Sequence, residues 1–524
     1  MKRPSKIKKI MHRFQNKGMG QTVVANDQPC AFSLKIEENE YDLKKQLGNS
    51  PDVVYRRFPI RFQNGELRQV LIIFIDGLVL EMTVRENVLK PLVEEPFQNI
   101  EQDPLTEIKE KLSVKRVTDE RKLTTAVQEV LKGKLLVIID GIDKGLIVHV
   151  EAFEFLRAVQ EPVSEKAVRG ARDGFIESSA VNISLLRRRI SHPALQFDTI
   201  KIGEFSQTSI VIAYIKGIAD PEIINRTKNR LNQIKVDAIR SSGDIEQYIE
   251  DHPYSIFSTI GNTERPDTAS ALLLDGRILI LTDGDPVSLY IPLFFLDNIK
   301  SIEDYNSRPY YSSFIRLIRF MAFILSTTLP SLYISALNFN KEMIPSDLLI
   351  PIIEAREIVP FSLWLEIALM ILMFEVVREA GVRLPQAVGP ALSIVGALIL
   401  GQVAVSAGLV GAPTIVIISV SYISAFIVTP IADITALTRI ALLISSSLFG
   451  PFGLIVALLG LVTHMVSLTS LGVPYMSPLA PTYFHDFKDA FIRFPTKWLK
   501  HRPKFIPNKR STKVKSLPDT GDKQ

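Results

Sequence analysis

Cysteine is almost absent from this chain: Cys30 is the only one in 524 residues. An intrachain disulfide is therefore excluded, and so is a zinc site built on paired cysteines. The chain also lacks GxxxxGK[ST], a GxGxxG turn after a strand, HExxH and GxSxG. P-loop or dinucleotide binding, zinc-dependent proteolysis and serine hydrolysis consequently have no support. We expect no metal, no cofactor and no enzymatic activity.

Charged side chains are missing from two long stretches. The 49 residues from Leu384 to Ala432 and the 46 residues from Ile440 to His485 contain no Asp, Glu, Lys or Arg. No core helix of a soluble protein needs such length, so a wholly soluble protein is excluded. Residues 1–312 have the charge content of an ordinary soluble chain. The basic start lacks the apolar stretch of a signal peptide, so we expect this region to stay in the cytoplasm.

Positive charge is concentrated at the two ends. Residues 1–20 carry seven Lys or Arg and no acid, and residues 488–524 carry eleven against three Asp. On a membrane protein, two basic ends predict contact with anionic lipid on the cytoplasmic side. Nucleic-acid binding is the competing interpretation, but the ends carry no interleaved aromatic platform, so we predict no nucleic-acid partner.

Composition and periodicity predict an α/β cytoplasmic region of two subdomains followed by a polytopic α-helical membrane domain. The predicted parts are a basic, polar tail (1–50), two α/β subdomains (51–150 and 151–310), a membrane domain with about five hydrophobic segments (311–470) and a basic tail (471–524). Apolar runs in both subdomains end in Asp-Gly, as at Asp140-Gly141 and Asp283-Gly284. Asp-Gly supplies the positive φ of a tight turn. The recurrence indicates either related building blocks or convergent turn chemistry.

The membrane domain raises a question of orientation. We predict spans at 314–337, 361–377, 388–409, 414–431 and 440–461. The basic residues before the first span and the basic carboxyl end both favour the cytoplasmic side. Five full spans would place the ends on opposite sides, so one segment is re-entrant or interfacial, or the charge bias is overridden at one end. The sequence leaves both possibilities open.

The third predicted span contains small residues at regular intervals. Gly396, Gly401 and Ser406 interrupt an otherwise apolar helix, and Gln402 is the one amide in its middle. Small residues allow close helix approach. Several copies in a ring would let such a helix line a narrow pore. The alternative is tight packing within one subunit.

Two acids lie inside the second predicted span, Glu366 and Glu375. Nine positions separate them, so they point to opposite sides of a helix and do not form one carboxylate pair. An acid in a membrane helix is costly and is often functional. We retain Glu366 as a candidate pore or gating residue beside Gly396, Gly401, Gln402 and Ser406. For Glu375 we expect a structural role, because arginines follow at the helix end.

An amphipathic helix is predicted over 176–190, ending in three consecutive arginines. Cations are favourable at a helix carboxyl end. The same guanidinium groups are suited to pairing with acids of a neighbouring subunit. Both interpretations stay open, and the candidate inter-subunit contacts are Glu177, Asn182, Arg187, Arg188 and Arg189.

Three segments resemble the hallmarks of A subunits of GerA-family spore germinant receptors. They read RAVQEPVSEKAVRGARDGFIESSAVNISLLRRRI, NFNKEMIPSDLLIPIIEAREIVPF with the helix sequence that follows, and SLGVPYMSPLAP. In family order and spacing they cover about residues 130–481. One departure is Ala171, where the family usually has proline, and it affects the expected stiffness of that loop.

The resemblance implies a multi-pass protein of the inner spore membrane with a cytoplasmic N-terminal domain. It implies a transporter-like B subunit that binds the nutrient, a lipoprotein C subunit, and a homo-oligomer that releases ions when germination starts. The alternatives are an accessory channel of the stage-five sporulation type, which amplifies ion release without sensing nutrients, and a non-conducting scaffold. A secondary transporter is disfavoured, because the spans show no inverted repeat.

Overall fold

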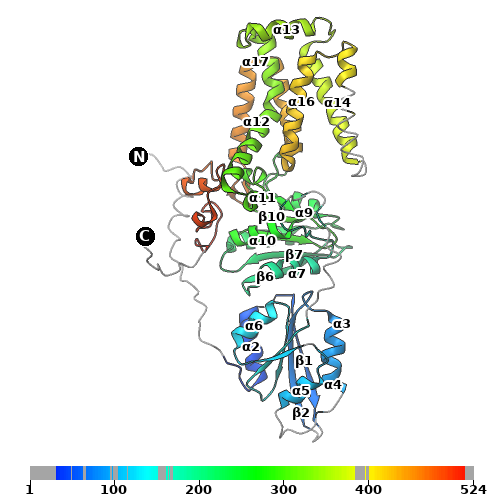
Figure 1. Cartoon of the computed structure of the whole chain (residues 1–524), viewed down its shortest axis with the longest axis vertical. Helices are drawn as coiled ribbons and strands as arrows, with labels where there is room; N and C mark the ends of the chain where they lie inside the picture. The colour runs from blue at the N-terminus through cyan, green and yellow to red at the C-terminus, as the bar shows by residue number, and fades with distance from the viewer. Residues whose placement is uncertain are drawn as a thin grey trace. The chain divides into compact units, whose positions relative to one another are not determined.

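The computed structural model describes residues 31–48, 50–62, 66–94, 97, 104–114, 116–150, 161–162, 165, 169–383, 396 and 401–513. Contacts between Cα atoms divide the chain into two compact units (Figure 1). The first comprises residues up to 49 and 53–152, and the second comprises 50–52 and 153 onward.

The first unit is an antiparallel sheet with helices on both faces. Its elements are α2 (Ile36–Leu47), β1 (Val53–Arg61), β2 (Leu67–Ile75), α3 (Glu81–Val84), η1 (Arg85–Leu89), α4 (Lys90–Glu94), α5 (Pro104–Lys111), β3 (Val117–Glu120), α6 (Leu123–Leu131), β4 (Leu135–Ile139) and β5 (Gly145–Val148). The strand order is β1-β2-β4-β5-β3. Because side chains of a strand alternate between faces, the VLIIFI run of β2 fills two cores, one with α2 and α6 and one with the helices α3 to α5.

The second unit begins with a sheet of the same design. Its elements before the apolar helices are α7 (Ser179–Arg189), β6 (Leu195–Ile202), β7 (Thr208–Ile215), α8 (Pro221–Gln233), α9 (Ser242–Ile249), β8 (Gly261–Thr263), α10 (Pro266–Asp275), β9 (Ile278–Thr282), β10 (Ser288–Ile291), η3 (Phe295–Asn298) and α11 (Glu303–Asn306). The antiparallel order is β6-β7-β9-β10-β8. Helices α8 and α9 cover one face, and α7 and α10 cover the other.

The two sheets have equivalent strand orders, and they also share two local hydrogen-bond patterns. Asp140 accepts from the N–H of Ile36 and Asp283 from the N–H of Ser179, in both cases across 104 residues. Asn39 and Asn182 each clasp the backbone six residues before them through both amide atoms. This recurrence favours related building blocks over convergent turn chemistry. Residues 271–274 form another apolar run that ends in Asp-Gly, but they belong to the end of α10 and not to a strand.

Apolar helices follow the second sheet. They are α12 (Pro309–Phe339), α13 (Ser346–Arg356), α14 (Leu363–Arg383), α16 (Ala412–Ile427) and α17 (Ala432–Ser467), with the short turns η4 (Lys341–Met343) and η5 (Thr429–Ile431) between them. Among the described residues, α12 and α17 are long and apolar enough to cross a membrane, and α16 is shorter. Most of the third predicted span, 388–409, lies outside the described residues; 401–406 are helical.

Gly450 divides α17 into two helices. Its φ of 59° and ψ of −141° are not helical, and Pro451 follows. Ser445 Oγ donates to the carbonyl of Gly453 at 2.8 Å. In one continuous helix, residues eight positions apart would be separated by about 12 Å along the axis, so the chain turns back here. The fifth predicted span is therefore two shorter helices, 432–449 and 451–467.

The chain after α17 returns to the second sheet. It forms the hairpin β11 (Thr469–Ser470) and β12 (Val473–Pro474), then η6 (Phe484–Lys488) and η7 (Thr496–Trp498). Leu471, Val473, Phe505 and Ile506 are buried in the core formed by α8, α9 and the sheet. Residues 471–513, which we expected to belong to a basic tail, thus complete an α/β core.

Candidate functional site

The feet of the apolar helices and the second sheet share one apolar core. It contains Phe257, Leu293, Phe295, Leu296 and Ile299 beside the sheet, Ala322 and Phe323 of α12, Val428, Ile431, Met465 and Leu468 of the later helices, and Tyr475 and Ala490 of the returning chain. The Phe295 and Phe323 rings meet edge to face at 5.4 Å. Fully burying a phenylalanine contributes about 2–3 kcal/mol. We call this cluster the junction; it gives the sheet a packed connection to the helices.

Arg316 ties both flanking segments to the foot of α12. Its side chain is fully buried, and Nε and Nη1 meet carboxylate oxygens of Asp304 at 2.7 Å and Asp489 at 2.8 Å. Arg319 adds a second contact to Asp304 at 2.8 Å. A buried charge tolerates burial only when it is paired in this way. The start of α12 and the returning chain are therefore held at one point.

The returning hairpin is fastened to the sheet domain by Asp251. This carboxylate accepts hydrogen bonds from the Thr469 hydroxyl at 2.7 Å and from the Gly472 N–H at 2.8 Å, and it pairs with Arg230. Burial alone would raise the pKa of Asp251, but these hydrogen bonds and the charge of Arg230 outweigh burial and lower the pKa. The carboxylate is thus held in its charged form.

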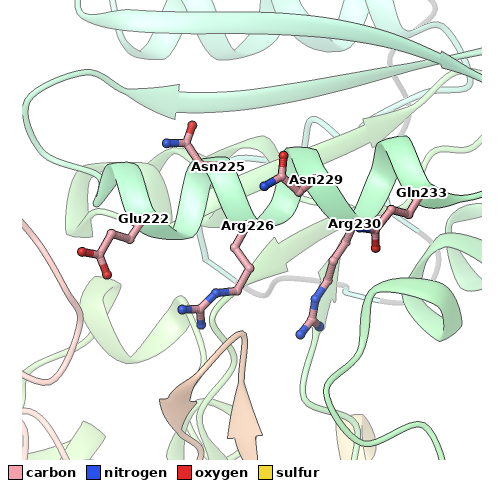
Figure 2. Close-up of a pocket in the computed structure, with 6 residues that line it drawn as sticks. All are labelled: Glu222, Asn225, Arg226, Asn229, Arg230 and Gln233. Atoms are coloured by element: carbon pink, nitrogen blue, oxygen red, sulfur yellow. The ribbon is translucent and has the colours of Figure 1, made fainter. Parts of the chain in front are cut away.

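A polar groove runs along α8, facing the same hairpin (Figure 2). It is lined by Glu222, Asn225, Arg226, Asn229, Arg230 and Gln233. Arg226 donates to the carbonyl of Leu471, and Arg230 donates to the carbonyl of Ile249. Both guanidinium groups donate hydrogen bonds to backbone carbonyls of the same chain, so this groove is a packing contact between α8 and the hairpin. Within the described ranges, no three His, Cys, Asp or Glu side chains are grouped to hold a metal.

Pro330 creates a second polar point inside the apolar helices. A proline has no N–H, so the carbonyl of Ser326, four residues earlier, loses its helical partner. Arg439 Nε and Ser421 Oγ both donate to this carbonyl at 2.8 Å. The Arg439 guanidinium also lies 4.1 Å from the ring centroid of Tyr422. One freed carbonyl therefore joins α12, α16 and α17.

Glu375 extends this polar point to α14. Its carboxylate accepts from the Tyr422 hydroxyl at 3.0 Å and pairs with Arg378 at 2.7 Å. The sequence predicted a structural role for Glu375 beside Arg378, and the contacts agree with that role. Arg439 was not singled out from sequence, although it directly precedes the second charge-free stretch and is one of two charged residues, with Asp433, between the two stretches.

Glu366 is fully buried where α14 meets the start of α16. One carboxylate oxygen accepts from the Gly411 N–H at 2.8 Å, and the other accepts from Arg356 Nε at 3.1 Å. The amino end of a helix favours a negative charge. A Cβ at Gly411 would lie 2.9 Å from Arg356 Cγ, so glycine permits this approach. In this chain Glu366 is occupied by two partners.

The other candidate pore residues separate into two kinds. Cβ atoms added at Gly401 and Gly396 would meet Ile415 Cγ2 at 3.6 Å and Val377 Cγ1 at 3.9 Å, so both glycines face neighbouring helices. Gln402 and Ser406 are exposed. Ser406 Oγ donates to the Gln402 carbonyl at 2.8 Å. The two glycines therefore pack against helices of the same chain, whereas the side chains of Gln402 and Ser406 are accessible from outside the chain.

The candidate inter-subunit contacts of α7 also divide. Arg187 is fully buried, and its Nε meets Asp52 at 2.7 Å. Asn182 is buried in its backbone clasp. Arg189 pairs with Asp173 of the same chain. Glu177, which precedes α7, and Arg188 are exposed, as is Arg189.

Sequence reasoning did not find the junction or Asp251. Asp251 lies two residues after the end of α9, in the sequence Ile-Glu-Asp-His-Pro, and nothing in that sequence marks its distant partners. The buried aromatic residues of the junction are Phe257, Phe295, Phe323 and Tyr475, which lie 28 to 218 positions apart, so no local spacing connects them.

Known proteins are similar to this chain over most of its length. Residues 41–505 match the model of the Bacillus/Clostridium GerA spore germination protein family. Spore germination protein KA of Bacillus subtilis (strain 168) is 40% identical over 90% of this chain and 86% of its own length. Spore germination protein GerLA of Bacillus cereus is 35% identical over 91% and 98%. The membrane protein YfkQ of Bacillus subtilis (strain 168) is 36% identical over 91% and 92%.

A solved structure is also similar to part of this chain. The crystal structure of the N-terminal domain of the A subunit of the Bacillus megaterium spore germinant receptor GerK3 is 30% identical in sequence, with a TM-score of 0.39. The match covers 51% of this chain and 98% of that domain.

Proposed function

We propose, since this chain belongs to the Bacillus/Clostridium GerA family of spore germination proteins, that it is the A subunit of a nutrient germinant receptor and couples a signal from partner subunits to ion release. The observation that carries this proposal is the junction. It joins an α/β domain, which can receive a partner, to helices suited to a membrane. Because close-packed cores transmit strain, a displacement of the α/β domain would displace the feet of the helices.

The course of the chain supports a multi-pass arrangement. The chain leaves the second sheet at α12 and returns to the same sheet at β11, so the helices between them cross a membrane an even number of times. The crossings are α12, α14, the helix containing Gly401, α16 and the two halves of α17. The break at Gly450 supplies the sixth crossing and brings both basic ends to the cytoplasmic side, as the positive-inside rule requires.

The exposed polar residues of the third span support a conduit between subunits. Gln402 and Ser406 are exposed, while Gly401 packs against α16. In a homo-oligomer the two polar side chains would face a central path, with Gly396 and Gly401 permitting the close packing behind it. Glu366, held by Arg356 and Gly411, would fix the helix ends beside that path rather than line it.

The α/β domains supply the surfaces for partners. Glu177, which precedes α7, and Arg188 of α7 are exposed and are available to a neighbouring subunit. Arg187, Arg189 and Asn182 would support that surface from within the chain. The transporter-like B subunit and the lipoprotein C subunit are the partners proposed for this receptor.

Germination of spores tests the proposal. Spores lacking the gene should lose germination to one nutrient; a partial slowing for all nutrients would instead favour the accessory stage-five type. Complementation with Gly401→Leu and with Gln402→Leu should fail, because the first wedges α16 and the second removes the polar lining. The matched control is Gly460→Leu, since a Cβ there meets nothing within 4 Å.

The non-conducting scaffold makes the opposite prediction. The reconstituted chain, with its partner subunits, should show ion conductance that Gln402→Leu reduces. If no conductance were measured under any condition, the non-conducting scaffold would be the favoured function. Normal germination of both Gly401→Leu and Gln402→Leu spores would refute the assignment of the third span.

A further inference from the structure

Exposed aromatic rings and exposed lysines gather around the foot of α12. The first turns of α12 expose Tyr310 (88%), Tyr311, Phe314 and Leu317 along one stripe. Residues 484–500, which we call the collar, expose Ile492 and Trp498 (63%). The collar also exposes Lys488, Lys497 and Lys500. Amphipathic rings beside lysines are typical of the boundary between a membrane and water.

The collar is packed on α12 and is not a free tail. The Phe320 and Phe491 rings meet at 5.0 Å. The Arg493 N–H donates to Ser313 Oγ at 3.0 Å, and the pair of Arg316 with Asp489 closes the same contact. Figure 1 shows this red segment beside the foot of α12. Two stretches distant in sequence therefore present one surface.

The charges of the collar are distributed unevenly. Asp489 is neutralised by Arg316 and accepts from the Tyr305 hydroxyl at 2.6 Å. Asp486 is buried and accepts the backbone N–H groups of Lys504 and Phe505. In the part of the chain that the structure describes, the three collar lysines pair with no acid. The outward face is consequently positive.

The length of α12 sets the height of this surface. The helix has 31 residues, or about 46 Å at 1.5 Å per residue. The hydrocarbon core is about 30 Å thick and takes about 20 residues. Residues 320–339 contain no charged side chain and fit that thickness. The turns before Phe320, with the collar, then lie at the level of the lipid headgroups.

We propose that the collar and the first turns of α12 form an anchor that binds anionic phospholipid headgroups on the α/β side of the membrane. The proposal rests on the membrane location given above. Trp498 and the tyrosines would sit at the interface with their polar edges toward water, and the three lysines would pair with phosphate groups. This anchor would hold the junction at a fixed depth.

The two tryptophans of the chain provide the test. The full-length protein is reconstituted into vesicles of phosphatidylcholine and phosphatidylglycerol in which one lipid carries bromine, a quencher of indole fluorescence. In Trp364→Phe, the remaining Trp498 should be quenched more by bromines near the headgroup than by bromines deep in the chain. In Trp498→Phe, the remaining Trp364, which is half-exposed at the start of α14, reports the embedding of the helices themselves.

The lysines are tested in the Trp364→Phe background. Brominated phosphatidylglycerol should quench Trp498 more strongly than brominated phosphatidylcholine at the same mole fraction. The variant Lys488→Gln/Lys497→Gln/Lys500→Gln should lose this preference, since each lysine near an anionic surface changes binding by about five-fold. The matched control is Lys201→Gln/Lys216→Gln/Lys235→Gln, which removes three exposed lysines of the second sheet domain and its helices.

The pattern of quenching distinguishes failure of the anchor, of the membrane location and of the role of the lysines. Quenching of Trp364 without quenching of Trp498 would overturn the anchor and leave the membrane location intact, and a protein partner on the collar would then be indicated. Quenching of neither tryptophan would overturn the membrane location itself. Equal quenching of Trp498 by both lipids, unchanged in the triple variant, would overturn the role of the lysines.

Discussion

Arg439 donates a hydrogen bond to the carbonyl oxygen of Ser326, with an Nε–O distance of 2.8 Å. The carbonyl is free only because Pro330, four residues later, has no N–H. An arginine on one apolar helix thus donates a hydrogen bond to a carbonyl that a proline leaves without a helical donor in another. The contact explains how a charged side chain that is 1% exposed persists among apolar helices.

Substitution of Arg439 should destabilise the helices strongly. Arg439→Leu leaves the Ser326 carbonyl with Ser421 as its donor and removes the cation beside Glu375, so we expect a loss of about 3–5 kcal/mol. The melting temperature of the detergent-solubilised protein measures this loss. The control Arg383→Leu removes an arginine side chain that is 79% exposed and should change stability by less than about 0.5 kcal/mol. Equal melting temperatures for both variants would contradict the role of Arg439.

The turn at Gly450 should tolerate no side chain. Its φ is positive, and a Cβ would lie 2.6 Å from Cγ of Phe339. Gly450→Ala therefore combines a backbone cost of about 1–2 kcal/mol with a steric clash. We expect a clear fall in melting temperature and a smaller membrane-inserted yield, measured beside Gly460→Ala. A stable Gly450→Ala protein would argue that the two halves of α17 form one straight helix.

Asp251 should make the hairpin contact sensitive to acid. Because its pKa is lowered from the usual 3.8, its stabilising contribution is complete above about pH 4 and is lost as pH falls through the folded-state pKa. Asp251→Asn should cost about 2–3 kcal/mol at pH 7. The melting temperatures of the two proteins should converge below pH 4. A constant difference between pH 7 and pH 3 would contradict this assignment.

Glu246 should show the opposite sign. Burial raises the pKa of this carboxyl above the usual 4.5, despite a hydrogen bond from the Ser258 hydroxyl at 2.6 Å. The folded state therefore favours the protonated form, and stability is lost as pH rises from about 4.5 through the folded-state pKa. Glu246→Gln keeps the acceptor and cannot ionise, so its melting temperature at pH 7.5 should exceed that of the parent by a few degrees. Glu204→Gln, at an exposed loop position, should change nothing.

Local patterns in the sequence predicted the parts of this structure that depend on neighbouring residues. The apolar runs at 70–75 and 135–139 are strands, the periodic stretch at 81–93 is helical, and α12, α14 and α16 lie where apolar spans were expected. Apolar residues also recur at helical spacing over 117–131, but Val117–Glu120 is β3, which pairs with β5 at the sheet edge, and α6 begins only at Leu123. Helical periodicity concerns residues within a few positions of each other, so it carries no information about the pairing of β3 with β5.

The parts that depend on distant residues could not be predicted. Gly450 belongs to an uninterrupted apolar stretch, so hydropathy joined two helices into one span and left the orientation unresolved. From its place at a helix end, Arg187 was expected to be a surface cation. It is instead buried and pairs with Asp52, which lies 135 positions earlier in the sequence. Spacing rules concern neighbours within a turn or two, and these contacts are made by the fold.

The core that Phe505 and Ile506 complete has a consequence for biosynthesis. Its other residues begin at Ile202, but the last ones leave the ribosome only after every apolar helix has been made. A nascent chain must therefore keep an unfinished sheet beside the membrane while insertion proceeds, and a message truncated near its 3′ end would yield inserted helices on an incompletely folded domain. Such products are the expected substrates of membrane proteases and chaperones.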